Sequence, residues 1–163
     1  MSPDSELLAE NSTMSDTYLR LIPNDPYYIP PKQAHSVAQE KLSQLIPKAT
    51  EVTVAVYDTA QFVDQGRYFE SVSCPYCGKD LNGWWQKAMD IAYKTQFDNL
   101  AVTLPCCYKQ TSLNELNYQM QAGFARFVLS VLGPQLDSDL TESELEPIER
   151  LLNCKIRQIW ARY

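Results

Sequence analysis

The chain has 163 residues, of which 45% are hydrophobic, and a formal net charge of −6 at pH 7. This length and hydrophobic content suit a folded domain with a core and argue against a chain that is disordered throughout. The excess of 20 Asp and Glu over 14 Lys and Arg argues against a nucleic-acid binder, which usually concentrates positive charge on one face. The longest apolar run, residues 127–132, is too short to span a bilayer, so no membrane insertion is expected.

The N-terminal residues lack the basic stretch followed by an apolar stretch that marks a secretory signal. Residues 1–16 are predicted to form a disordered leader in front of a single α+β domain over residues 17–163. Five cysteines without an export signal indicate free thiols in a reducing cytoplasm rather than a disulfide framework.

The two ends of the domain show the same order of predicted elements. At the N-terminal end, a strand over 17–23 precedes a helix over 33–46 and an alternating strand over 51–58. At the C-terminal end, residues 125–134 form either a strand or a buried helix, because their apolar run is continuous.

A helix over 143–153 and a strand over 155–163 follow at the C-terminal end. The regular part of that helix is expected to begin near Glu146, which puts Pro147 in its first turn, where a missing N–H costs least. The repeated order predicts an α+β fold with a mixed or antiparallel sheet and helices on one face, built from two ferredoxin-like strand–helix–strand units.

The middle of the chain, residues 67–110, is predicted to be a zinc-knuckle insertion. It begins with a strand over 67–74 and continues with a helix over 80–94, for which Asp80 is the expected N-cap. A short strand over 99–105 leads into the second group of cysteines. Trp84 and Trp85 are expected to pack on the zinc loop and in the core.

Four cysteines in this segment are the candidate metal ligands. Cys74 and Cys77 form a Cys-x-x-Cys pair followed by Gly78, and this spacing lets a tight turn direct two thiolates at one ion. The second pair, Cys106 and Cys107, is adjacent in sequence. A closed tetrahedral site needs four ligands, so the two pairs together predict a structural zinc ion.

Two alternatives concern the fourth ligand and the chemistry. If Cys107 turns away, His35 or Cys154 could complete the coordination shell. A Cys-x-x-Cys pair just before a helix is also typical of redox motifs, although redox chemistry gives no reason for a second pair. Thiols without a specific role are the remaining interpretation.

The segments "CPYCG" and "LPCC" resemble zinc-ribbon and treble-clef insertions, and the resemblance covers roughly residues 67–110. It implies a metal that stabilises the fold, often on a module that binds other macromolecules. The chain as a whole is similar to small bacterial proteins of unknown function.

These observations favour a non-enzymatic, zinc-stabilised module that binds a protein partner, such as an adaptor or an immunity-type protein that neutralises a basic partner. A nucleic-acid-associated zinc-ribbon protein is one alternative, and it requires a basic patch beside the metal. A thiol- or metal-dependent enzyme is the other, and it requires an open coordination position or a reactive thiol.

Overall fold

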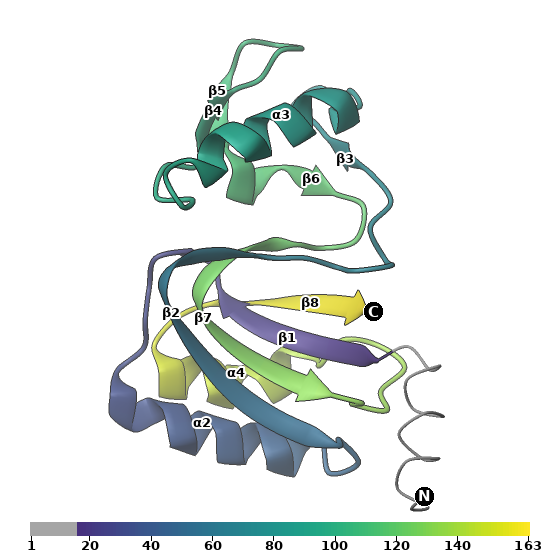
Figure 1. The fold of residues 1–163 in the computed structure, drawn as a ribbon. Helices are drawn as coiled ribbons and strands as arrows, with labels where there is room; N and C mark the ends of the chain where they lie inside the picture. Colours follow the sequence, from purple (N-terminus) through teal and green to yellow (C-terminus); the bar gives the residue numbers. More distant parts are fainter. Residues whose placement is uncertain (1–15) are drawn as a thin grey trace, which may run out of the picture.

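The computed structural model describes residues 16–163, and it contains a four-stranded antiparallel sheet that two helices cover (Figure 1). The sheet contains β1 (Thr17–Pro23), β2 (Glu51–Val63), β7 (Gly123–Leu132) and β8 (Ile156–Arg162), in the spatial order β2-β7-β1-β8. Two helices, α2 (Lys32–Leu45) and α4 (Glu142–Leu152), connect β1 to β2 and β7 to β8. This is the strand order of a ferredoxin-like α+β fold, so the expected pair of strand–helix–strand units is confirmed.

Both helices cover the same face of the sheet, because each strand directs alternate apolar side chains toward them (Figure 1). Leu19 and Leu21 of β1 and Phe127 and Leu129 of β7 are fully buried against Leu42 of α2. The run over 125–134, for which strand and helix were both open, is therefore the central strand β7, whose apolar residues are covered on both faces.

Two predicted helix starts are wrong by a few residues. Helix α4 begins earlier than expected because Thr141 and Glu144 form a capping box, and this leaves Pro147 inside the helix rather than in its first turn. Helix α3 (Asn82–Tyr93) has Leu81 as its N-cap residue. Asp80 lies outside the helix and accepts a hydrogen bond from the Asn82 N–H at 2.8 Å.

The segment between β2 and β7, residues 64–122, lies on the side of the sheet opposite α2 and α4 (Figure 1). We refer to it as the cysteine segment. Besides α3 it contains β3 (Val72–Ser73), β4 (Ala101–Thr103), β5 (Gln110–Ser112), the short 3₁₀ helix η1 (Leu113–Glu115) and β6 (Asn117–Tyr118). The strand expected over 67–74 is confined to its last part, since residues 65–69 form turns closed by backbone hydrogen bonds.

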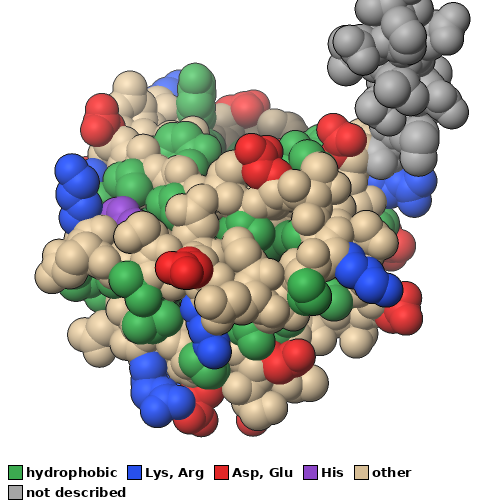
Figure 2. Space-filling view, turned by 90° about the horizontal axis from the view of Figure 1, so that it is seen from below, with side chains coloured by type: hydrophobic (Ala, Val, Ile, Leu, Met, Phe, Trp, Pro, Cys, Tyr) green, Lys and Arg blue, Asp and Glu red, His purple; other side chains and the backbone are tan. Residues whose placement is uncertain are grey.

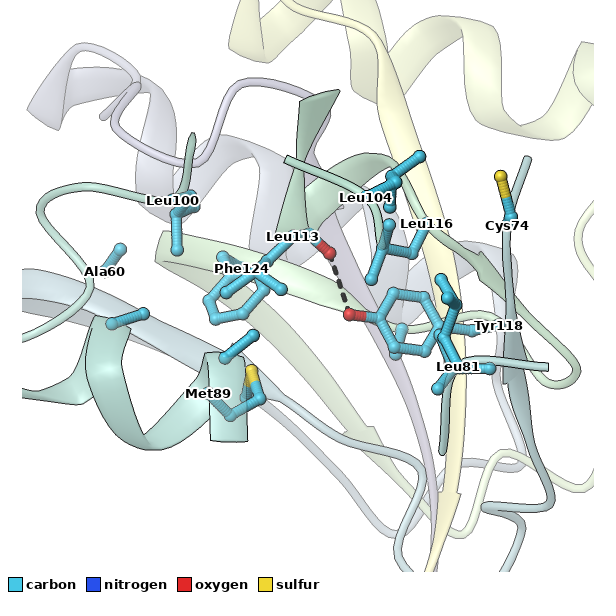
Figure 3. Close-up of a cluster of buried hydrophobic side chains, with 14 residues drawn as sticks. Ala60, Cys74, Leu81, Met89, Leu100, Leu104, Leu113, Leu116, Tyr118 and Phe124 are labelled. Carbon is cyan, nitrogen blue, oxygen red and sulfur yellow. Dashed lines mark hydrogen bonds between the residues drawn. The ribbon is translucent and has the colours of Figure 1, made fainter. Parts of the chain in front are cut away.

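A second core holds the cysteine segment together and extends to the sheet (Figure 3). Phe124 of β7 is fully buried in it, and Phe62 of β2 lies with its ring centroid 5.1 Å from that of Phe124. Tyr118 donates a hydrogen bond to the Leu113 carbonyl oxygen at 2.7 Å and accepts one from the Trp85 indole N–H at 3.1 Å. Trp85 therefore packs in this core, as the sequence predicts for one of the two tryptophans.

Polar contacts add further links between the sheet and the cysteine segment. Arg157 of β8 donates from Nη1 to the backbone carbonyl oxygens of Asn114 and Ala122, at 2.9 and 3.0 Å. Its Nη2 lies 3.2 Å from a carboxylate oxygen of Glu115. The Tyr27 hydroxyl lies 2.9 Å from the carbonyl oxygen of Phe97.

No helix among the described residues is both long and apolar enough to cross a membrane. The leader expected over 1–16 lies outside the described residues except for Asp16, which exchanges backbone hydrogen bonds with Tyr163. Figure 2 shows the face that carries α2 and α4, where acidic and basic side chains are interspersed.

Arg157 provides a test of the link between the sheet and the cysteine segment. We expect Arg157→Ala to lower the free energy of unfolding by about 2–4 kcal/mol, because it leaves buried carbonyl oxygens without a charged donor. Arg150→Ala is the matched control, since the Arg150–Glu146 pair is exposed and should contribute under about 1 kcal/mol. Urea titrations of both variants measure the difference, and equal losses would show that Arg157 is not a specific link.

Candidate metal centre

The first pair of cysteines lies on a tight turn between β3 and α3. The Cys74 N–H donates to the Lys79 carbonyl oxygen at 2.8 Å, and the Gly78 N–H donates to the Cys74 carbonyl oxygen at 2.9 Å. Gly78 has a φ of 76°, a conformation that glycine adopts without steric cost. The turn folds the backbone around the Cys74 sulfur, which accepts the N–H groups of Tyr76 and Cys77 at 3.3 and 3.4 Å.

The second pair lies on a turn of the same construction, between β4 and β5. The Leu104 N–H donates to the Lys109 carbonyl oxygen at 2.9 Å, and the Tyr108 N–H donates to the Leu104 carbonyl oxygen at 2.9 Å. Tyr108, at the place of Gly78, also has a positive φ, of 61°. The two turns therefore match residue for residue, "CPYCGK" (74–79) with "LPCCYK" (104–109).

This match gives the adjacent cysteines different places in the turn. Cys107 corresponds to Cys77, the second cysteine of the first turn. The place of Cys74 is taken by Leu104, whose side chain is fully buried. The fourth sulfur comes instead from Cys106, at the place of Tyr76.

The structure brings the four sulfur atoms of Cys74, Cys77, Cys106 and Cys107 within 4.8 Å of one another. The Cys77 and Cys106 sulfurs are 3.3 Å apart, and the Cys74 and Cys107 sulfurs are 3.8 Å apart. Four sulfurs at about 2.3 Å from a zinc ion in a tetrahedron are about 3.8 Å from each other. The cluster therefore has the size of a tetrathiolate coordination shell.

The thiols of the cluster affect one another's ionisation. For Cys74, burial opposes ionisation, but hydrogen bonds from the backbone of Cys77 and Tyr76 and from neighbouring thiols outweigh it and lower its pKa to about 6. For Cys106, burial and hydrogen bonds with the neighbouring thiols raise the pKa to about 12. Without a metal the sulfurs thus share protons, and a bound cation would displace those protons.

The surroundings of the cluster suit a metal with thiolate ligands. A divalent ion with four thiolates carries a net charge of about −2. Lys79 and Lys109 occupy equivalent places on the two turns and bring two positive charges to this end of the molecule. Soft thiolate ligands select zinc, copper(I) or iron, and a shell of four is typical of structural zinc.

The two alternative ligands lie elsewhere. The ring nitrogen Nε2 of His35 is 2.9 Å from the Pro30 carbonyl oxygen, and the His35 ring packs on Phe127 in the core between sheet and helices. Cys154 packs against that same core, where burial and then the charge of Glu149 raise its thiol pKa to about 11. Neither residue belongs to the four-sulfur cluster.

One feature of the site was missed at the level of sequence, namely the equivalence of the two turns. A signal for it exists, since Pro, Cys and Lys recur with the same spacing at 75, 77 and 79 and at 105, 107 and 109. Comparison of the chain with protein-family models, curated proteins and solved structures gave no match.

The equivalence of the turns predicts that a ligand can be moved from Cys106 to position 104. Cys106→Tyr alone should reduce zinc affinity at least tenfold, because it removes one of four thiolates. Adding Leu104→Cys should restore a metal content near one ion per chain, with the second turn now matching the first. Zinc titration against a chromophoric chelator measures both variants, and a double variant no better than Cys106→Tyr would contradict the equivalence.

Proposed function

We propose that Cys74, Cys77, Cys106 and Cys107 bind one structural zinc ion, and that the protein acts by binding another protein rather than by catalysis. The observation that carries the first part is the convergence of four sulfur atoms from two separate turns within 4.8 Å. Four thiolates would fill a tetrahedral shell and leave no position for substrate or water, which favours a structural over a catalytic ion.

The ion would stabilise a part of the chain whose regular elements are short. Strands β3, β4, β5 and β6 have only two or three residues each, and isolated hairpins of this size are marginally stable. A metal that joins the two turns closes a loop of roughly 30 residues, and a cross-link of that span contributes about 3–4 kcal/mol. Zinc would thereby also fix the start of α3 relative to β4.

The distribution of exposed apolar surface supports a binding role for the cysteine segment. Among the described residues, the four most exposed large hydrophobic side chains all belong to it: Tyr108, Tyr93, Ile91 and Tyr76, at 80%, 68%, 65% and 53%. Aromatic side chains are enriched at protein–protein interfaces. These side chains are carried by the part of the chain that the zinc ion would hold in shape.

A thiol-based redox function is the second candidate, supported by the 3.3 Å between the Cys77 and Cys106 sulfurs and by the lowered pKa of Cys74. The two candidates differ in the metal content of the native protein. A structural site retains zinc through purification and resists thiol reagents, whereas a redox pair is metal-free and is alkylated quickly by iodoacetamide.

The proposed site predicts that the protein contains about one zinc ion per chain. We expect Cys74→Ser and Cys107→Ser each to abolish stoichiometric zinc and to lower Tm by about 7–14 °C, the equivalent of about 3.5 kcal/mol for a chain of this size. Cys154→Ser is the control and should keep the metal. Elemental analysis and thermal unfolding check these outcomes.

Wild-type protein without metal after purification under reducing conditions would refute the site. A Cys107→Ser variant that keeps its zinc would show that another residue supplies the fourth ligand.

A further inference from the structure

A groove runs between helix α3 and strand β4 on the outside of the cysteine segment. Its volume is about 450 Å³. It is lined by Trp84, Lys87 and Ile91 from α3, by Thr95 just after that helix, and by all three residues of β4, Ala101, Val102 and Thr103. We call it the α3–β4 groove. Its lining is predominantly apolar, and Lys87 is its one charged residue among those described.

The β4 side of this groove is an unpaired strand edge. In the β4–β5 pair, the Leu104 N–H donates to the Lys109 carbonyl oxygen, and the Leu113 N–H donates to the Leu100 carbonyl oxygen. Because backbone groups alternate in direction along an antiparallel strand, residues 100, 102 and 104 direct their N–H and carbonyl groups toward β5. Ala101 and Thr103 therefore direct theirs to the opposite side, where both residues line the groove.

Three outward-facing backbone groups at this edge have no hydrogen-bond partner among the described residues: the Thr103 N–H, the Thr103 carbonyl and the Ala101 carbonyl. The fourth, the Ala101 N–H, donates to the Asn99 side chain at 3.0 Å. An edge with free N–H and carbonyl groups is a template for one more strand. A helix placed alongside such an edge supplies the wall for the added strand's side chains.

The charge of the groove indicates what such a strand carries. Lys87 forms no ion pair with any described residue. An acidic side chain at the matching place in a bound strand would pair with it at the rim of an apolar groove. The apolar flank formed by Trp84 and Ile91 favours apolar side chains at alternate positions of the same strand.

We propose that the α3–β4 groove binds an extended segment of a partner protein, which adds to β4 as a third strand of the β4–β5 sheet. The segment has apolar residues at alternate positions and an acidic residue that contacts Lys87. This proposal rests on the protein-binding role proposed above and specifies its surface and the class of its partner. Because β4 runs directly into the second cysteine turn, the metal also fixes the orientation of the edge that the partner recognises.

The probes for the test are short peptides selected from a random phage-displayed library on the zinc-loaded, full-length protein. Enriched peptides should share alternating apolar residues and an Asp or Glu. Their binding to the ¹⁵N-labelled protein should shift the amide resonance of Thr103 and the resonances of α3. Proteins that bind peptides by strand addition use main-chain hydrogen bonds for affinity and side-chain pockets for specificity.

Three variants make the test specific. Thr103→Pro removes the outward N–H while leaving the β5-facing groups of Val102 intact, and edge strands tolerate proline at such a place. It should weaken peptide binding at least tenfold, the effect of losing about 1.4 kcal/mol. Thr103→Ala keeps the N–H and should stay within about threefold of wild type, whereas Lys87→Glu should weaken acidic peptides and favour basic ones.

The zinc content of each variant is measured in the same samples, so that loss of the metal site is distinguished from loss of the groove. The proposal is overturned if no peptide sequence is enriched, or if selected peptides bind Thr103→Pro as tightly as wild type while zinc is retained. It is also overturned if sedimentation shows a dimer that Thr103→Pro dissociates, since the groove would then pair with a second copy of the chain. A protein without zinc that still binds peptides at β4 would contradict the metal site alone.

Discussion

The convergence of four cysteine sulfurs at one point is the constraint on which the cysteine segment depends. Two turns, thirty residues apart in sequence, have to present their sulfurs within 4.8 Å. The first turn does so through Cys74 and Cys77, while the second uses Cys106 because the buried Leu104 takes the first place. The adjacent pair of cysteines is thus a variation within an ordinary turn, since both turns keep the same backbone hydrogen bonds.

The cysteine segment is joined to the sheet by side-chain packing and by a few polar contacts. Phe124 of β7 is buried in the core beneath the cysteine turns, and Arg157 of β8 donates to carbonyl oxygens of the same segment. The sheet therefore serves as the base on which the cysteine segment is held. The most exposed aromatic side chains, Tyr108, Tyr93 and Tyr76, and the β4 edge lie on the segment itself.

Hydrophobic periodicity predicted much of this architecture. The spacing of Ala38 and Leu42 and the alternation in β2 follow from burial of one face, and the order of elements at the two ends indicated the ferredoxin-like sheet. Strands of two or three residues, such as β5 and β6, carry no such pattern, because tertiary contacts rather than periodicity define them.

The sequence also predicted which four cysteines form the candidate site, but it did not predict how they are arranged in space. Spacing alone left His35 and Cys154 as alternative ligands, and only the fold places them apart from the cluster.

X-ray absorption at the zinc edge of the native protein is the most direct test of whether the four cysteines bind zinc. We expect four sulfur ligands at about 2.3 Å from the zinc ion. A shell with a nitrogen or oxygen ligand, or with fewer than four sulfurs, would contradict it.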